Sequence, residues 1–281
     1  MTRPQFLSRF WRNRAAVAGL ATLLLVVLMA VMAPWLIAHE PWDMVEQPFV
    51  APLQTSGVWL GTDALGRDVA AGLIMGSRVS LMVGLAATMV ALTAGILVGA
   101  VAGYYGNSTD SLLMRFTEFF QAIPGFAFAI VVVAIFQPSV SSIVTAIALV
   151  SWPPVARLVR SEFLTLRQRE FVQAAVLAGQ SDLRIIFTQI LPNAISPIIV
   201  MGSMMVASAI LLESALSFLG LGDPNQMSWG YMVGAARTAL RQAWWIALCP
   251  GLAIAITVLS LHLVGEGLND SLNARLHGRN R

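Results

Sequence analysis

Glu213 is the acidic residue that this sequence places inside a long apolar run, Leu211-Leu212-Glu213-Ser214. A carboxylate at membrane depth is costly, so it must face water or polar neighbours. Two roles meet that requirement. Glu213 either lines a path for a cationic cargo group, or it is a helix-end acid tied to Ser214, Ser217 or a partner protein. We favour the second role, because the end of the apolar run is close and the cost of insertion falls there.

His262 and Cys249 are the other reactive side chains in apolar runs. Membrane proton relays use histidines in chains with acids, and the nearest acid in the sequence is Glu266, one helical turn away. This favours a hydrogen-bonded core histidine over a relay. A single cysteine cannot form an internal disulfide and has no metal-ligand spacing. We therefore interpret Cys249 as a small buried hydrophobe.

The composition excludes several kinds of chemistry. The 17 basic residues are all arginine, and the sequence contains no lysine. A phosphate-binding P-loop requires a lysine after its glycines, so no such ATPase site lies in this sequence. No nucleophile–base constellation or metal-ligand cluster is present either. We expect no catalytic residue, no metal site and no cofactor in this chain, and therefore no enzyme. The arginines are not gathered on one soluble face, so nucleic acid is not an expected partner.

The elements that must position these residues are membrane helices. The chain is 57% hydrophobic and 11% charged, with a mean hydropathy of +0.76, which indicates a multi-pass membrane protein. A helix needs roughly 20 apolar residues to cross about 30 Å of hydrocarbon. Pro124 lies inside the third apolar run, so that span could begin as early as Leu112. We predict six spans, at 15–37, 79–103, 122–137, 139–153, 193–212 and 243–264.

The distribution of arginine predicts the orientation. If both chain ends are cytoplasmic, 13 arginines lie inside and four outside, which is a strong positive-inside bias. The cytoplasmic set is Arg3, Arg9, Arg12, Arg14, Arg115, Arg157, Arg160, Arg167, Arg169, Arg184, Arg275, Arg279 and Arg281. The outer set is Arg67, Arg78, Arg237 and Arg241.

Two local patterns precede and follow the first span. Residues 1–14 carry Phe6, Leu7, Phe10 and Trp11 among arginines, which predicts an amphipathic helix on the inner membrane surface. The span at 15–37 exceeds the core of a signal peptide and no small-x-small cleavage site follows it, so we expect a retained anchor. In the second span, a stripe of small residues predicts close helix packing. The stripe is Gly95, Gly99 and Gly103.

A charged loop at 157–192 separates the fourth and fifth spans. Its composition predicts a helix at 161–178, ended by Gly179 in a left-handed conformation. Ser181 is a natural N-cap for a second short helix at 182–190, with Asp182 near its positive end. Pro192 then opens the fifth span. The prediction is a compact helix–turn–helix knob facing the cytoplasm, in which Ala174 and Ala175 leave room for a partner.

This loop resembles the cytoplasmic EAA loop of bacterial ABC-importer permeases, through which a membrane subunit docks on its ATPase. The EAA pattern is an acid, two alanines, three residues, a glycine and an Ile/Leu-Pro ending. The sequence has Ala174-Ala175, Gly179 and Ile190-Leu191-Pro192 in that arrangement, with Gln173 in place of the acid and Glu170 one turn earlier. By resemblance, the ATPase-coupling residues are Glu170, Phe171, Gln173, Ala174, Ala175, Gly179, Ser181 and Asp182.

Two more segments resemble dipeptide, oligopeptide and nickel permeases, specifically the C-type subunit of the pair. Residues 60–69, Leu-Gly-Thr-Asp-Ala-Leu-Gly-Arg-Asp-Val, lie in the predicted outer loop at 38–78. Residues 217–224, Ser-Phe-Leu-Gly-Leu-Gly-Asp-Pro, precede Ser228-Trp229-Gly230. We expect the first segment to fix an outer gate rather than to bind substrate. Its residues are Gly61, Thr62, Asp63, Gly66, Arg67 and Asp68.

Local chemistry suggests how that segment folds. Asp63 could cap a short helix beginning at Ala64, while Gly61 and Gly66 permit turns. Asp68 lies next to Arg67 in the sequence and could also pair with Arg78.

The resemblance implies an all-α fold of six transmembrane helices, the type I ABC-importer permease fold, with residues 79–281 as its core. It implies a bacterial inner-membrane location and a homologous second permease. It also implies two ATPase subunits that bind ATP and Mg, and an extracytoplasmic binding protein. Di- or oligopeptides are the expected cargo, with nickel or a metal chelate as the alternative. A secondary transporter driven by an ion gradient is the rival class, but it predicts repeats and paired membrane charges that this sequence lacks.

Overall fold

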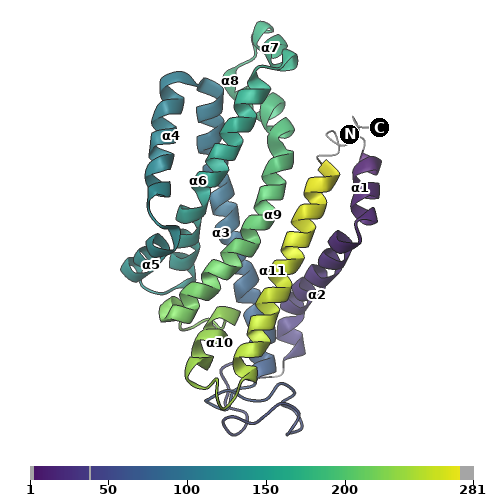
Figure 1. The fold of residues 1–281 in the computed structure, drawn as a ribbon, viewed down its shortest axis with the longest axis vertical. Coiled ribbons are helices and arrows are strands. Elements are labelled where there is room, and N and C mark those ends of the chain that lie inside the picture. Colours follow the sequence, from purple (N-terminus) through teal and green to yellow (C-terminus); the bar gives the residue numbers. More distant parts are fainter. Residues whose placement is uncertain (1–2, 38, 273–281) are drawn as a thin grey trace.

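The computed structural model describes residues 3–37 and 39–272, and within these ranges the chain is almost entirely helical, without a named strand. The helices lie side by side along one long axis (Figure 1). Their bounds are α1 Arg3–Arg12, α2 Arg14–Leu36, α3 Val69–Tyr105, α4 Asn107–Ala122, α5 Gly125–Phe136, α6 Val140–Arg167, α7 Glu170–Leu177, α8 Asp182–Ile185, α9 Leu191–Leu216, α10 Trp229–Ala235 and α11 Trp245–Leu272.

Five segments of the described chain are long and apolar enough to cross a membrane, or six if a bent pair of helices counts as one span. The bent pair is α4 and α5, which meet at 84°. Pro124 causes the break, because the residue before a proline avoids the helical region. Ile123 accordingly adopts φ −86 and ψ 130. Five of the six predicted spans are present as long helices, and the count reaches six only if the broken pair α4–α5 is taken as the predicted third span in place of the single run 122–137.

The second span begins ten residues earlier than the predicted start at 79. Asp68 caps α3, because its carboxylate accepts a hydrogen bond of 2.8 Å from the Ala70 amide. Arg78 interrupted the apolar pattern but not the helix, which carries its side chain at the surface. With 37 residues, α3 is about 55 Å long at 1.5 Å per residue. It therefore extends beyond a hydrocarbon layer of about 30 Å.

The fourth span does not end at Pro153, as predicted, but continues as α6 through Pro153 and Pro154 to Arg167. It starts with a capping box, in which Ser139 and Ser142 each accept a hydrogen bond from the other's backbone amide. A proline inside a membrane helix is tolerated where neighbouring elements compensate for the lost backbone bond. Here the long helix α3 packs along α6.

The α3–α6 contact is the centre of the bundle, and the small-residue stripe makes it possible. A β-carbon added at Gly99 would lie 2.8 Å from the Val159 Cβ, and one at Gly103 would lie 2.6 Å from the Phe163 Cβ. Both distances are shorter than real β-carbon contacts, so only glycine permits this approach. The packing role predicted for the stripe is confirmed.

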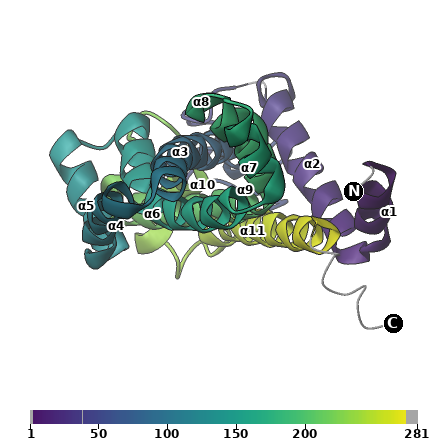
Figure 2. The same cartoon turned by 90° about the horizontal axis from the view of Figure 1, so that it is seen from above.

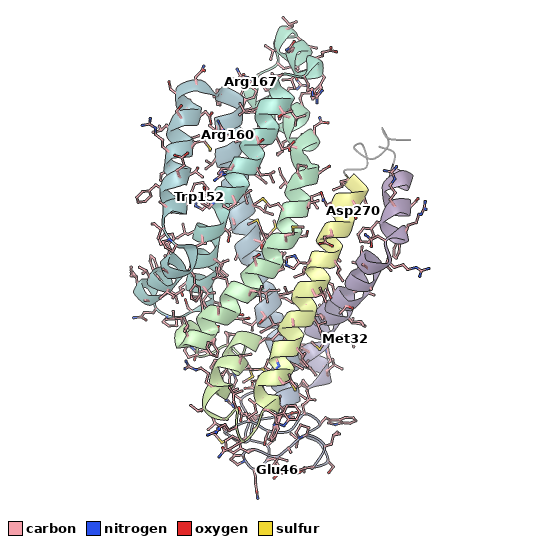
Figure 3. All side chains as sticks on the ribbon, viewed as in Figure 1. Met32, Glu46, Trp152, Arg160, Arg167 and Asp270 are labelled. Carbon is pink, nitrogen blue, oxygen red and sulfur yellow. The ribbon has the colours of Figure 1, made fainter. Side chains whose placement is uncertain are left out.

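On one side of this centre lie α4 and α5, and on the other lie α1, α2 and α11 (Figure 2). Phe10 of α1 is buried against Gly267 of α11, so the predicted N-terminal helix is present and packs on the last span. Figure 3 places Arg160 and Arg167 at one end of the bundle and Glu46 at the other. The end of α11 and α1 lie toward the Arg167 end, opposite the loop between α2 and α3 (Figure 1).

Candidate functional site

The α7–α8 loop, defined as residues 168–190, projects from the Arg167 end of the bundle (Figure 1). The predicted single helix 161–178 is wrong, because α6 ends at Arg167 and α7 starts at Glu170. Between them the backbone of Arg169 is extended, with φ −76 and ψ 147. Gln173, at the position where the EAA pattern has an acid, donates from its side-chain amide to the Gln168 carbonyl at 3.3 Å. This contact fastens α7 to the end of α6.

Gly179 ends α7 in the left-handed conformation that the sequence predicts, with φ +72. The Gly179 amide donates to the Val176 carbonyl at 2.9 Å, and the Gln180 amide donates to the Ala175 carbonyl at 3.2 Å. These two bonds form a Schellman motif, which satisfies helix-end carbonyls through a residue with positive φ. The turn is therefore a defined structure.

After the turn, the chain differs from the predicted separate helix 182–190. Helix α8 continues without a break through the π-helical turn Ile186–Ile190 into α9. The Leu191 amide donates to the Ile186 carbonyl five residues earlier, and this wider turn accommodates Pro192, which has no amide hydrogen to donate. The fifth span thus extends into the α7–α8 loop as one 40-residue helix.

Asp182 joins this loop to α3. Ser181 lies at the N-cap position, but its side chain forms no capping hydrogen bond. The Asp182 carboxylate instead accepts a hydrogen bond of 2.8 Å from the Tyr104 hydroxyl at the end of α3. The Arg167 guanidinium lies over the Tyr104 ring, 5.9 Å from its centroid. Three helices therefore converge at this point.

Packing divides the predicted coupling residues between two faces of α7. Ala174, Gln173 and Glu170 are exposed, but Ala175 is only 6% exposed and packs with Val172 into the core. The expectation that both alanines face a partner is therefore wrong for Ala175. The core side of this contact consists of Phe163, Ile185, Ile186 and Ile190.

Exposed apolar side chains surround the loop, and of these only Phe171 is among the predicted coupling residues. Leu177 is 88% exposed at the last turn of α7. A pocket of about 550 Å³ lies beside it, between α7 and the end of α3. An exposed apolar surface of this kind usually marks an interaction site. The other exposed apolar residues of the loop are Phe171, Val176, Leu183 and Phe187.

At the opposite end of the bundle, Asp63 organises a tight turn and not the predicted helix from Ala64. Its carboxylate accepts hydrogen bonds from the Leu65 amide at 2.8 Å, the Arg67 amide at 3.0 Å and the Arg67 Nε at 2.6 Å. Gly66 closes the turn with φ +77. When an aspartate accepts a hydrogen bond from the backbone amide two residues ahead, the structure is an Asx-turn. The prediction that Asp63 binds nearby amides is therefore right, but the predicted helix is wrong.

Arg67 and Asp68 have separate partners. Arg67 pairs with Asp63 and lies over the Trp42 ring, 5.3 Å from its centroid. Burial lowers the pKa of Arg67, but hydrogen bonds with Tyr231 and Asp63 raise it above its usual value on balance. Asp68 caps α3 and lies 3.5 Å from His39. The pairing of Asp68 with Arg78 is not found among the ion pairs of the described chain.

Thr62 fastens this loop to the last span. Its hydroxyl donates to the Gln47 carbonyl at 2.7 Å and accepts from the Val50 amide at 2.9 Å. Its carbonyl accepts a hydrogen bond of 3.2 Å from the Trp245 indole at the start of α11. Gly61, with φ +77, lies directly under the Val50 carbonyl, where a side chain would clash. The loop between α2 and α3 is therefore tied to α11.

Glu213 lies in a buried cluster of hydroxyl groups, the Glu213 cluster, formed with Ser214, Ser217 and Ser228. Glu213 is buried, with only 2% of its surface exposed. Its carboxylate accepts from Ser217 at 2.8 Å, from Ser228 at 2.7 Å and from Ser214 at 3.4 Å. Ser214 and Ser217 are the partners predicted from the sequence, whereas Ser228 is an additional partner that lies 15 residues away along the chain, where no local pattern indicates it.

The Glu213 cluster connects α9 to α10 and α3. Ser228 also caps α10, because its hydroxyl accepts from the Tyr231 amide at 3.1 Å. Trp229 donates from its backbone amide to Ser80 at 3.1 Å and from its indole to the Leu73 carbonyl at 2.8 Å, both on α3. This geometry is that of a helix-end acid held by serines.

The remaining reactive residues lie elsewhere. His262 is exposed on α11, so the predicted core histidine is wrong, while Cys249 is partly buried on the same helix. Across the described residues, no group of three or more His, Cys, Asp or Glu side chains is arranged to hold a metal ion.

Comparison with known proteins identifies this arrangement. A family model described as the binding-protein-dependent transport system inner membrane component matches residues 95–278. A second model, the N-terminal TM domain of oligopeptide transport permease C, matches residues 5–53.

Related proteins match along nearly the entire chain. The di/tripeptide transport system permease protein DppC of Pseudomonas aeruginosa is 39% identical, over 97% of this chain and 93% of the relative. The oligopeptide transport system permease protein OppC of Haemophilus influenzae is 36% identical, over 95% and 86%. The dipeptide transport system permease protein DppC of Alkalihalophilus pseudofirmus is 38% identical, over 94% and 87%.

The fold is shared with a solved transporter. A chain of the MetNI methionine ABC transporter, in inward-facing conformations, has a TM-score of 0.60 at 12% identity, covering 71% of this chain and 96% of that chain. At this identity the likeness shows the fold alone. Together with the family models, it confirms the predicted all-α importer-permease fold in the inner membrane. The chain belongs to the family of binding-protein-dependent transport system inner membrane components, the permeases of ABC importers, as a C-type member similar to dipeptide and oligopeptide permeases.

Proposed function

We propose that this chain is a permease subunit that moves di- or oligopeptides across the inner membrane, driven by ATP that partner subunits hydrolyse. The observation that supports peptides as the cargo is the similarity to a peptide permease along nearly the full chain, at 39% identity over 97% of it. We further propose a second permease, two ATPase subunits and an extracytoplasmic binding protein as partners. ATP and Mg belong to the ATPases in this proposal.

The α7–α8 loop is the proposed docking surface for an ATPase. Its exposed face combines Leu177 with polar residues such as Glu170 and Gln173, which suits a groove that buries an apolar anchor within a polar rim. The Schellman turn at Gly179 and the buried packing of Ala175 make the loop stiff. A stiff loop transmits a displacement of the ATPase without absorbing it.

The route of that displacement is built into the chain. Helix α8 is continuous with α9, which carries Glu213 at its far end. The Tyr104–Asp182 bond joins the same loop to α3. A movement of the loop would therefore reach the Glu213 cluster and the Asp63 turn through two long helices. We propose that this end is the outer gate, with both chain termini and the α7–α8 loop in the cytoplasm, as the arginine distribution predicts.

Reconstitution tests this function. The complete importer is reconstituted in proteoliposomes with ATP inside the vesicles and the binding protein outside. These vesicles should accumulate labelled dipeptides or oligopeptides. Uptake should stop when the ATPase is inactivated and should persist when ionophores collapse ion gradients. Uptake of nickel instead of peptides would reject the cargo, and uptake that follows an ion gradient without ATP would reject the transporter class.

A further inference from the structure

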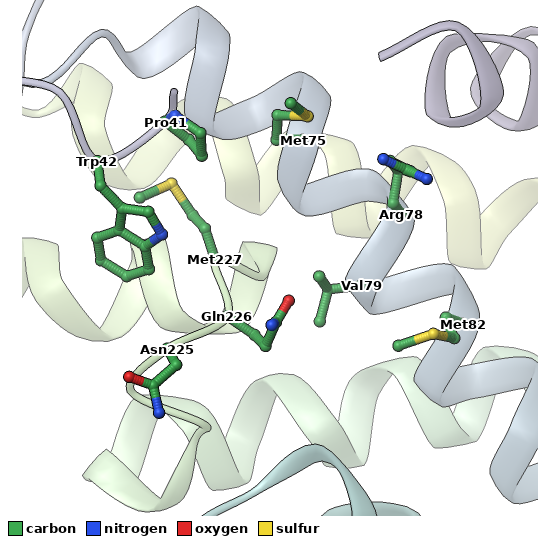
Figure 4. A pocket seen from close by; sticks show the side chains of 9 residues that line it. All are labelled: Pro41, Trp42, Met75, Arg78, Val79, Met82, Asn225, Gln226 and Met227. Carbon is green, nitrogen blue, oxygen red and sulfur yellow. The ribbon is translucent and has the colours of Figure 1, made fainter. Parts of the chain in front are cut away.

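Arg78 lines two adjoining cavities near the loop between α2 and α3. Every other residue that lines these two cavities is uncharged. The smaller cavity, of about 330 Å³, has a polar side formed by Asn225 and Gln226. Figure 4 shows Trp42 and Arg78 on opposite sides of it. The larger cavity, of about 620 Å³, is an apolar groove between α2 and α3. Met82 also belongs to both linings.

The Arg78 guanidinium has no acidic partner in residues 3–37 and 39–272, where the ion pairs are His39–Asp68, Arg67–Asp63 and Arg160–Asp110. Residues 79–105 of α3 contain no charged side chain. At 1.5 Å per residue these 27 residues span about 40 Å, which exceeds the hydrocarbon thickness of about 30 Å. Because α3 can cross the hydrocarbon without including Arg78, and a charge within the hydrocarbon is costly, we expect the guanidinium at the level of the bilayer phosphates.

The groove below Arg78 follows two helices at helical spacing. On α3 its lining continues through Leu81, Met82 and Leu85, and its floor contains Val206 of α9 and Leu261 of α11. On α2 it includes Trp35, the lining residue nearest the outer loop in the sequence. Tryptophan is enriched at the membrane interface, so both helices place an interface residue at the same end of the groove. The remaining α2 lining is Leu23, Val27, Ala30, Val31 and Pro34.

We propose that these two cavities form one binding site for a phospholipid of the surrounding bilayer. The phosphate binds Arg78, whose planar guanidinium matches phosphate oxygens. The head group occupies the smaller cavity beside Asn225 and Gln226, and one acyl chain lies in the groove against Leu81 and Leu85. This occupant is favoured because it supplies both an anion and a long apolar body. The competing occupant is a helix of the second permease, which cross-linking from position 85 distinguishes from a lipid.

Photo-cross-linking tests the site in the complete importer. The probe is phosphatidylethanolamine with a diazirine in the middle of one acyl chain, and the control is diacylglycerol with the same chain. The phospholipid should label peptides from residues 23–35 and 78–85. It should do so roughly tenfold more than diacylglycerol, the factor expected for one charge-assisted hydrogen-bonded contact. Equal labelling by the two probes would overturn the phosphate contact, even if no variant assembled.

Matched variants locate the contact. Arg78→Gln should lower labelling roughly tenfold, Arg78→Lys should retain most of it, and Arg241→Gln should leave it unchanged. Arg241, which precedes α11, is also an exposed arginine, but it lines neither cavity. Full labelling of Arg78→Gln would refute the proposal.

A groove-filling pair tests the acyl chain. Leu85→Trp should block labelling, whereas Leu97→Trp on the same helix should not. Leu85 is 57% and Leu97 55% exposed, but only Leu85 lines the groove. If a cysteine at position 85 cross-links to the second permease in the native membrane, a protein helix fills the groove and the lipid proposal fails.

Discussion

The Tyr104 hydroxyl donates a 2.8 Å hydrogen bond to the Asp182 carboxylate, joining residues 78 positions apart at the Arg167 end of the bundle. Tyr104 lies in the last turn of one long helix, and Asp182 starts another. The two helices lead to the Asp63 turn and the Glu213 cluster. This bond therefore links the position of the α7–α8 loop to both of these sites.

Tyr104→Phe should weaken the coupling of ATP hydrolysis to transport. A hydrogen bond to a charged group contributes roughly 1.5–3 kcal/mol, so the loop should lose a fixed position without unfolding. We expect peptide uptake per ATP hydrolysed to fall several-fold in proteoliposomes. Tyr105→Phe is the matched control, since Tyr105 lies beside it and is more exposed. An equal effect of both substitutions would reject the role of the bond.

Gly179→Val should uncouple the ATPase while leaving the subunit in the membrane. A β-branched residue resists φ +72, although a β-carbon there meets no atom within 4 Å. The cost is therefore backbone strain and not a clash. Gly179→Asn should restore transport, because asparagine tolerates the left-handed region. Normal transport by the valine variant would contradict the stiff-loop account.

Glu213→Gln should be mild, since an amide oxygen can still accept from Ser217 and Ser228. Glu213→Leu should lower the melting temperature of the complex, because it leaves buried hydroxyl groups without an acceptor, at roughly 1–3 kcal/mol each. Thermal unfolding and peptide uptake separate the two roles. If Glu213→Gln abolishes uptake in a normally assembled complex, Glu213 lines the cargo path and does not merely hold α9 to α10.

Two glycine-to-alanine substitutions should have opposite effects on stability. Gly99→Ala forces apart α3 and α6, where a β-carbon would lie 2.8 Å from the Val159 Cβ, and overpacking costs about 1–3 kcal/mol. Gly251→Ala adds a methyl group where no atom lies within 4 Å and gains helix propensity, up to about 1 kcal/mol. We expect a lower melting temperature for the first variant and an equal or higher one for the second.

The sequence predicted what depends on local chemistry. Apolar runs identified the spans, and the left-handed Gly179 followed from its place after a helix-forming run. The prolines show the limit of this reasoning. Pro124 breaks a helix and Pro153 does not, although both interrupt apolar runs. The difference lies in the packing of α6 along α3, which no local pattern reveals.

The candidate site shows the same limit. Asp63 was expected to bind nearby amides, and it does, but a helix cap and an Asx-turn use the same hydrogen bonds. Ala175 was expected at the surface, yet it packs on residues that follow it in α8 and the π-helical turn. Ser228 reaches Glu213 only because α10 folds back on α9. These outcomes depend on contacts between separate elements.

Cysteine cross-linking of Leu177 tests the central claim most directly. In a Cys249→Ala background, Leu177→Cys places the single thiol at the most exposed apolar point of the loop. We predict that the thiol in cells resists impermeant reagents added outside and cross-links to an ATPase subunit, with a yield that changes on ATP binding. Labelling from outside the cell, or cross-linking only to lipid, would contradict the account.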